Sequence, residues 1–286
     1  MTKDILYPYP IHKTKLDNGC EIAYMDEGKG SKTLVFIHGL ALYAPSWRKN
    51  IAYLKQYYRC IAIDLPGNGL SSKGDYPYSI KFFSACIYEF IKKNNLKNVC
   101  LVGHSMGGQI AATTIINHPG CATELILCAP AGFEIFSGFE KSLYHSSLHL
   151  FDFFSSEEHS LKKTIQSSFF HRTSQGDDMA DELAILMRAY PVNKYKVMIE
   201  SCIKGMLDEP VFENLYLIKQ HCLVLFGERD ALIPNKFIHP ISTKKLAEDA
   251  TKRIPDCKLV MIPQCGHLLQ IEKEKEVNHD IHDFLK

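Results

Sequence analysis

A serine between glycines is the feature of the sequence whose residue types point most directly to chemistry. Residues 103–108 read GHSMGG, which places Ser105 two residues from a glycine on either side. A serine hydroxyl becomes a nucleophile when a neighbouring base removes its proton. Glycines are needed where such a serine lies at the tip of a sharp turn, because a Cβ atom would meet the adjacent strand and helix. The pattern predicts a nucleophilic serine, and an ordinary strand-to-helix turn without chemistry is the alternative.

A candidate acid and a candidate base follow this serine along the chain. Asp230 lies in the segment GERDALIP and His267 in the segment CGHLLQIE, and each segment comes after an apolar run. A histidine can accept the proton of a serine, and a carboxylate can orient that histidine. Functional loops gather at the carboxyl ends of parallel strands, so we expect Ser105, Asp230 and His267 to meet there. Glu228 is the alternative acid, whereas Asp64 lies in a tight turn and is expected to be structural.

Apolar runs of strand length alternate with segments of helical periodicity along most of the chain. Buried strands are expected at 33–37, 60–63, 99–102, 125–128, 222–226 and 258–262. Helices are expected at 47–56, 79–94, 109–117, 242–253 and 270–284. This alternation predicts a parallel sheet with helices on both faces. A tight-turn sequence at 17–19 predicts an antiparallel hairpin ahead of it, whose second strand is 21–24.

The alternation is interrupted in the middle of the chain. Residues 133–214 contain no apolar run typical of a buried strand, and the stretch is too long for an unstructured loop in a compact domain. We therefore expect a helical insertion, or cap, at 133–214 and a core domain formed by 1–132 and 215–286, with a loop at 174–178 inside the insertion. The aromatic residues of the insertion are expected either in its core or against substrate: Phe151, Phe153, Phe154, Phe169, Phe170, Tyr190 and Tyr195.

The composition and net charge of the sequence indicate which binding partners and which cellular location to expect. The net charge is +1, so charge gives no reason to expect nucleic acid or an anionic membrane as a partner. No apolar stretch is long enough to span a bilayer and the N-terminus lacks the apolar core of a signal peptide, which favours a cytoplasmic location. Ten cysteines without a CxxC pair and thirteen histidines without an HExxH motif predict no metal site. Cys265 is expected to be a packed thiol.

Five segments of the sequence together resemble the α/β-hydrolase superfamily, in its branch of serine hydrolases with a helical cap. They are HGL at 38–40, DLPGNGLSS at 64–72, GHSMGG, GERDALIP and CGHLLQIE. The resemblance covers nearly the whole chain and implies an α/β fold with a mostly parallel eight-stranded sheet, flanking helices and a helical cap. It also implies Ser105 as nucleophile, Asp230 as acid and His267 as base, with no metal and no organic cofactor.

In this family two backbone N–H groups stabilise the oxyanion, and the resemblance assigns them to Leu40 and Met106. Four residues near these loops are candidate substrate contacts: His38, Trp47, His104 and Leu268. Structural roles are the alternatives. His38 would shape the oxyanion loop or merely pack, His104 would support the turn, and Trp47 would belong to the core.

These features predict hydrolysis of a carboxylic ester or lactone of a small, apolar substrate through an acyl-enzyme, with water as the second substrate. A C–C bond hydrolase of ring-cleavage products is the alternative, because GHSMGG and CGHLLQIE are similar to parts of that group. That group tends to have Asn where His104 stands and Trp where Leu268 stands. A non-catalytic ligand-binding protein on the same scaffold is a third alternative, and a homodimer is left open.

Overall fold

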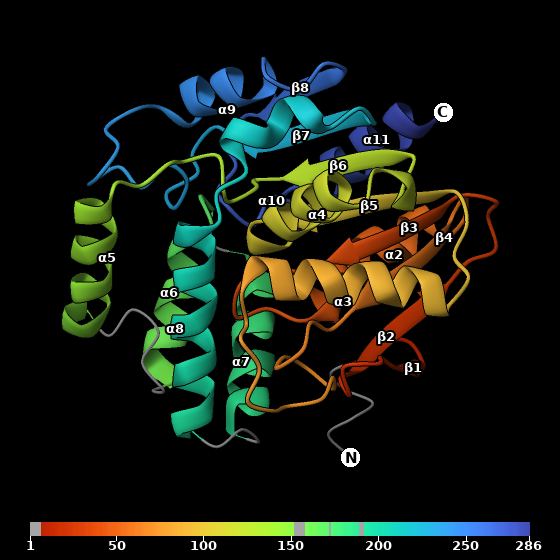
Figure 1. Ribbon diagram of the computed structural model, residues 1–286, viewed down its shortest axis with the longest axis horizontal. Helices are drawn as coiled ribbons and strands as arrows, with labels where there is room; N and C mark the ends of the chain where they lie inside the picture. Colours follow the sequence, from red (N-terminus) through yellow and green to blue (C-terminus); the bar gives the residue numbers. More distant parts are fainter. Residues whose placement is uncertain (1–6, 152–157, 172, 189–191) are drawn as a thin grey trace.

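An eight-stranded sheet forms the centre of the computed structural model (Figure 1), which describes residues 7–151, 158–171, 173–188 and 192–286. From edge to edge the strands run in the order β1-β2-β4-β3-β5-β6-β7-β8. Their bounds are β1 Ile11–Lys15, β2 Glu21–Glu27, β3 Thr33–Ile37, β4 Arg59–Ile63, β5 Val99–His104, β6 Glu124–Cys128, β7 His221–Gly227 and β8 Cys257–Ile262. β2 pairs antiparallel with both β1 and β4, and all other neighbours are parallel. The predicted mostly parallel sheet is confirmed.

The central strands are buried because helices cover the sheet on each side. Every residue of β3 and β5 is buried, as expected for the sequences TLVFI and VCLVGH in a parallel sheet. α3 (Ile80–Lys93) packs against α4 (Met106–Asn117) on one face, and α2 (Arg48–Leu54) packs against α11 (Glu274–Leu285) on the other (Figure 1). α9 (Thr243–Thr251) packs against β7 and β8. Two short 3-10 helices complete this part, η1 Ala44–Trp47 and η2 Pro119–Cys121.

The predicted hairpin lies at the N-terminal edge of the sheet. Lys15 of β1 pairs with Glu21 of β2. In the turn, Gly19 adopts a φ of 85° and Asn18 Oδ1 accepts a hydrogen bond from the Cys20 N–H at 2.9 Å. Asparagine and glycine favour turns for these two reasons, a local side-chain bond and tolerance of positive φ. The hairpin is confirmed, with a second strand that extends beyond the predicted one.

Two predicted helices differ from the structure by more than two residues at an end, whereas α2, α3 and α9 agree with the prediction to within two residues. α4 begins at Met106, three residues earlier than predicted, because Gly107 and Gly108 lie inside the helix despite their low helix propensity. The predicted single closing helix is wrong, since the chain forms α10 (Leu269–Glu272) and then α11. Lys273 separates them with a φ of −126° and a ψ of 47°, which interrupts the helical backbone.

Between β6 and β7 the described part of the chain forms helices and no strand. They are α5 Gly138–Phe151, α6 Glu158–Ser167, α7 Ser174–Arg188 and α8 Val192–Asp208, followed by the 3-10 helix η3 Phe212–Leu217. Figure 1 shows α6, α7 and α8 at the end of the sheet toward which the arrows of the parallel strands point. We call α5–α8 the inserted helices, and their separation as a cap domain stays a prediction. No helix of the described ranges is both long and apolar enough to cross a membrane.

The loop predicted at 174–178 is wrong, because α7 begins at Ser174. Thr173 Oγ1 accepts a hydrogen bond from the Gly176 N–H at 3.0 Å, and Asp177 lies in the first turn of the helix. A hydroxyl cap and an early carboxylate both stabilise a helix N-terminus, so the polar cluster starts a helix. Three of the aromatic residues expected in the insertion lie outside the described residues: Phe153, Phe154 and Tyr190.

Candidate active site

The turn between β5 and α4 holds Ser105 in a strained backbone conformation. Its φ is 53° and its ψ is −120°, a region that residues with a side chain rarely occupy. A Cβ atom on Gly103 would lie 2.3 Å from the Gly107 carbonyl oxygen, and one on Gly107 would lie 2.3 Å from the Ile37 carbonyl oxygen. Both glycines are therefore required by close backbone approach. The turn thus has the geometry of a nucleophile elbow, with a partly exposed serine at its tip.

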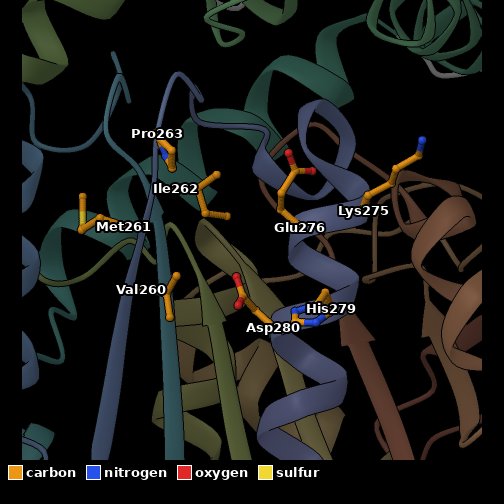
Figure 2. A pocket seen from close by; sticks show the side chains of 8 residues that line it. All are labelled: Val260, Met261, Ile262, Pro263, Lys275, Glu276, His279 and Asp280. Atoms are coloured by element: carbon orange, nitrogen blue, oxygen red, sulfur yellow. The ribbon is translucent and has the colours of Figure 1, made fainter.

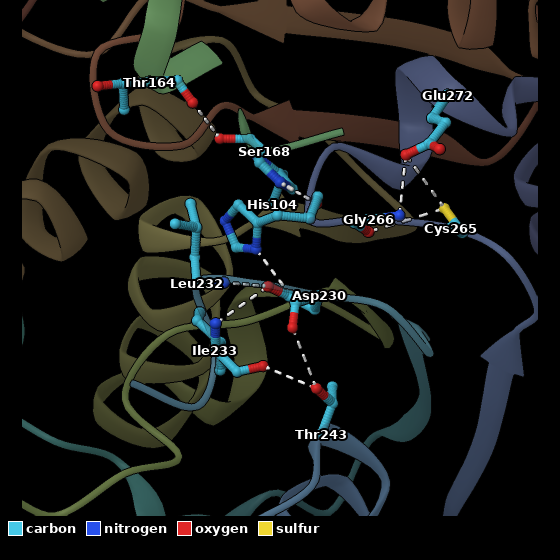
Figure 3. Close-up of polar contacts among 11 residues, drawn as sticks. His104, Thr164, Ser168, Asp230, Leu232, Ile233, Thr243, Cys265, Gly266 and Glu272 are labelled. Atoms are coloured by element: carbon cyan, nitrogen blue, oxygen red, sulfur yellow. Dashed lines mark hydrogen bonds and ion pairs between the residues drawn. The ribbon is translucent and has the colours of Figure 1, made fainter. Parts of the chain in front are cut away.

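The predicted acid and base are in direct contact. Asp230 Oδ2 lies 2.8 Å from His267 Nδ1, and both side chains are buried. Asp230 Oδ1 accepts hydrogen bonds from the N–H groups of Leu232 at 2.8 Å and Ile233 at 3.0 Å, as Figure 3 shows. Three hydrogen bonds therefore fix the carboxylate. Because His267 uses Nδ1 for this contact, Nε2 is the nitrogen that can accept a proton.

The structure distinguishes Asp230 from two other acidic residues near the ends of strands, Glu228 and Asp64. Glu228 is exposed, whereas Asp230 is fully buried against the histidine. Asp64 is also fully buried, but it accepts hydrogen bonds from the Tyr7 hydroxyl at 2.6 Å and from the Ala44 N–H at 2.7 Å. Burial raises the pKa of the Asp64 carboxyl. These contacts join the N-terminal segment to the loops after β3 and β4, which is the structural role expected of this residue.

His104 links the serine turn to the histidine loop. Its Nε2 lies 3.0 Å from the carbonyl oxygen of His267, and the two rings are 4.9 Å apart. Burial, with His267 and His38 nearby, holds the pKa of His104 well below its usual range, so the ring is neutral and donates this bond from Nε2–H. Among the described residues no hydrogen bond joins Ser105 Oγ to His267 Nε2, a contact that often tightens only when substrate binds.

The loop after β3 passes directly against the Ser105 turn, and its role in binding an oxyanion stays a prediction. A Cβ atom on Gly39 would lie 3.1 Å from Ser105 Cβ. Leu40 is the next residue of this loop. Met106 is the first residue of α4, where helix geometry leaves the backbone N–H without an acceptor inside the helix. The N–H groups of Leu40 and Met106 therefore belong to two backbone segments that meet at Ser105.

The buried ring of His38 fixes the start of this loop through two contacts with backbone. Its Nε2 accepts a hydrogen bond from the Leu65 N–H at 3.0 Å, and its Nδ1 lies 2.8 Å from the Gly39 carbonyl oxygen. Burial lowers the pKa of His38 to about 4, so the ring is neutral and Nδ1–H donates to Gly39. The His38 side chain is fully buried, so it supports the loop and is not exposed to a substrate in this structure.

The remaining predicted contacts are also buried. Trp47 is fully buried and its ring lies 5.1 Å from that of Phe36, which places it in the core. Leu268 is 3% exposed. Burial and the nearby Glu272 carboxylate raise the pKa of the Cys265 thiol, which is the behaviour of a packed thiol and not of a nucleophile.

An open groove lies elsewhere on the molecule, between β8 and α11. Figure 2 shows its lining, with the apolar side chains of the edge strand on one side and charged side chains of the helix on the other. Its residues are Val260, Met261, Ile262, Pro263, Lys275, Glu276, His279 and Asp280. None of Ser105, Asp230 and His267 lines it, so this groove is separate from the candidate active site.

Two residues that contact the loop of His267 were not predicted from the sequence. The carbonyl oxygen of Ser168, between α6 and α7, accepts a hydrogen bond from the His267 N–H at 2.8 Å. Glu272 accepts one from the Gly266 N–H at 2.8 Å. The position of Glu272 in the segment CGHLLQIE, five residues after His267, is a signal that could have been used, whereas Ser168 offers no pattern.

Comparison with known proteins identifies the fold family. The model of the α/β hydrolase fold family matches residues 32–274. The chain is 27% identical over 285 residues to the uncharacterized hydrolase YugF of Bacillus subtilis, covering 97% of this chain and 98% of the relative. It is 34% identical over 121 residues, 41% of each chain, to the 2-hydroxy-6-oxo-6-(2'-aminophenyl)hexa-2,4-dienoic acid hydrolase of Metapseudomonas resinovorans.

Among solved structures, a probable hydrolytic enzyme from Pseudomonas aeruginosa superposes with a TM-score of 0.84 at 25% identity, over 98% of this chain and 95% of that one. The family match covers most of the chain and agrees with the strand order and with the serine turn. The protein is therefore a hydrolase that belongs to the α/β-hydrolase superfamily.

Proposed function

We propose that the protein is a serine hydrolase that cleaves a carboxylic ester or lactone of a small, apolar substrate through an acyl-enzyme. The observation that carries the proposal is the 2.8 Å contact between Asp230 and His267 at the sheet edge where the strained Ser105 turn lies. Nucleophilic acyl transfer needs an oriented histidine and an accessible serine at the same edge of the sheet, and Ser105 is partly exposed there. Water is the second substrate.

In the proposed mechanism Ser105 Oγ attacks the substrate carbonyl carbon while His267 Nε2 takes the serine proton. Asp230 orients the ring and stabilises the imidazolium that forms. The N–H groups of Leu40 and Met106 bind the oxyanion, each with a contribution of about 2.7–4 kcal/mol to the transition state. His267 then protonates the leaving alcohol, and it later deprotonates the water that hydrolyses the acyl-enzyme.

The inserted helices are proposed to act as the cap that selects the substrate. They approach the catalytic loops closely, because the carbonyl oxygen of Ser168 binds the His267 N–H at 2.8 Å. The neighbouring Phe169 is buried, and Phe170 is 42% exposed. Aromatic residues in a segment whose backbone contacts the histidine loop favour an apolar acyl or alcohol part of the substrate.

Covalent labelling and turnover together test the proposal. A fluorophosphonate should label the wild-type protein at Ser105, and p-nitrophenyl esters of short and long acids should be hydrolysed. The variant Ser105→Ala should lose labelling and at least about 10⁴-fold in kcat, while Ser31→Ala, which changes an exposed serine before β3, should keep both. Turnover that survives in Ser105→Ala would overturn the proposal.

Hydrolysis of a C–C bond is the second candidate, favoured by the 34% identity over 121 residues to the dienoic acid hydrolase. The group of C–C hydrolases tends to have Asn where His104 stands. In this protein the buried His104 ring binds the backbone of His267, which favours the ester or lactone. A dienone ring-cleavage product in the same substrate panel separates the two reactions. Turnover of the dienone without turnover of any ester or lactone would replace the first candidate with the second.

A further inference from the structure

Glu272 is a buried carboxylate that binds backbone on two segments at once. Its Oε2 accepts hydrogen bonds from the N–H groups of Gly266 at 2.8 Å and Phe170 at 3.1 Å, and its Oε1 accepts one from His171 at 2.7 Å. Figure 3 shows the carboxylate beside Gly266 and Cys265. The side chain is thus shared between the loop of the catalytic histidine and the connection from α6 to α7.

The two segments joined by Glu272 are in backbone contact. A Cβ atom on Gly266 would lie 2.5 Å from the Ser168 carbonyl oxygen and 2.6 Å from the Phe170 nitrogen. The next residue, His267, donates its N–H to Ser168 at 2.8 Å. Only a glycine at 266 permits this approach, so the histidine loop and the inserted helices form one packed unit at this point.

Removing the carboxylate would leave three backbone donors without their acceptor. The hydrogen bond to the Gly266 N–H is buried, so this donor would retain its desolvation penalty, whereas the donors of Phe170 and His171 are partly buried. Hydrogen bonds to a charged acceptor are stronger than neutral ones, so all three contacts weaken when the carboxylate is removed. The segments would then relax toward water, and the adjacent bond from His267 to Ser168 would weaken with them. The side chain of His267 would lose its fixed direction, although Asp230 would still be present.

From this arrangement we propose that Glu272 is a positioning residue for His267. Its carboxylate clamps the histidine loop to the backbone of residues 170 and 171, so that the imidazole is aligned for Ser105 only while the inserted helices are docked. This inference rests on the proposed function for its kinetic consequence. Its structural consequence, the alignment of the ring with Asp230, does not depend on the reaction.

Three variants test the clamp. Glu272→Gln keeps the size of the side chain but replaces one acceptor oxygen with an NH₂ group, and Glu272→Ala removes the clamp. Glu182→Gln is the matched control. Glu182 on α7 binds the Arg48 guanidinium, with Nη1 at 2.8 Å, and the Tyr43 hydroxyl at 2.5 Å. It therefore joins the same inserted helices to the core without touching the histidine loop.

The kinetic readout is the separation of kcat from KM on a p-nitrophenyl ester, with the rate of fluorophosphonate labelling. Glu272→Gln should lower kcat and the labelling rate roughly tenfold with KM within about twofold, because ground-state binding is unchanged. Glu272→Ala should lower them further. Glu182→Gln should keep both rates within about twofold of wild type.

A spectroscopic readout covers the case in which Ser105 is not the nucleophile. The proton on His267 Nδ1 in its bond to Asp230 should give a downfield NMR resonance, assigned by its loss in His267→Ala. This resonance should broaden or exchange faster in both Glu272 variants and stay sharp in Glu182→Gln. An unchanged resonance in Glu272→Gln, or equal broadening in the Glu182 control, would overturn the clamp. Failure of wild-type labelling would overturn only the proposed function.

Discussion

Replacing Asp230 by asparagine separates the charge of the acid from its shape. Oδ1 accepts hydrogen bonds from the N–H groups of Leu232 and Ile233, and Oδ2 binds Nδ1 of His267. An asparagine has a single acceptor oxygen. Placing that oxygen on the side of the two backbone donors keeps one more hydrogen bond than turning it toward the histidine, a preference of about 1 kcal/mol. The NH₂ group then faces His267 Nδ1.

This orientation inverts the roles of the ring nitrogens. Nδ1 must accept a hydrogen bond from the asparagine, so the ring proton moves to Nε2 and the nitrogen that should take the serine proton is blocked. In a serine triad this wrong tautomer lowers kcat about 10⁴-fold, which corresponds to about 5.4 kcal/mol of transition-state stabilisation. We expect a loss of the same order for Asp230→Asn.

The assay compares kcat on a p-nitrophenyl ester with the rate of fluorophosphonate labelling, after thermal melting has shown that the variant is folded. Both rates should fall together, since both need a base for Ser105. Glu228→Gln is the matched control, because Glu228 lies on the same loop and is exposed. We expect its rates to stay within about twofold of wild type.

Two outcomes would refute this reasoning. If Asp230→Asn lost less than about tenfold in kcat, the tautomer would not control the reaction and the acid would have to be sought elsewhere. If Glu228→Gln lost as much as Asp230→Asn, the exposed carboxylate would be acting as the acid. Either result would contradict the role drawn from the 2.8 Å contact.

Gly107→Ala should lower the thermal midpoint, because its Cβ would lie 2.3 Å from the Ile37 carbonyl oxygen. We expect a loss of about 3 kcal/mol in the free energy of unfolding, which corresponds to roughly 6–12 °C. Calorimetry measures the midpoint, and an unchanged midpoint would contradict the predicted clash. The free energy of unfolding should fall as pH drops from 6.5 to 4, because burial lowers the pKa of His38 to about 4 and only the unfolded state binds the proton in this window. The difference corresponds to about 3 kcal/mol. Urea unfolding at pH 6.5 and pH 4 measures this difference. His38→Asn should show a shallower dependence on pH, and an equal slope would exclude His38 as its source.

The fold and the approach of acid to base could be predicted from local patterns and one geometric rule. Ser105, Asp230 and His267 each follow an apolar strand, and parallel strands end at one edge of the sheet. The choice of Asp230 over Glu228 could not rest on pattern alone. It depends on which carboxylate turns inward, and the structure buries the first and exposes the second.

Helix boundaries were harder to predict, because tertiary contacts override helix propensity. Gly107 is a poor helix former, yet it lies in the first turn of α4 since only a residue without Cβ fits beside Ile37. The polar cluster at 174–178 has the composition of a loop. It forms a helix because Thr173 caps it, and a cap of this kind is indistinguishable in composition from a turn.

The contacts of Glu272 with the inserted segment could not be predicted, because they are made to backbone N–H groups. Every residue except proline carries such a donor, so residues 170 and 171 need no particular side chain to be bound. The demand for specific residues falls on the other side of the contact. Glu272 must supply a carboxylate, and Gly266 must lack a Cβ, since one would lie 2.5 Å from the Ser168 carbonyl oxygen. The inserted segment can therefore vary in sequence and still be bound through its backbone to the loop that carries His267.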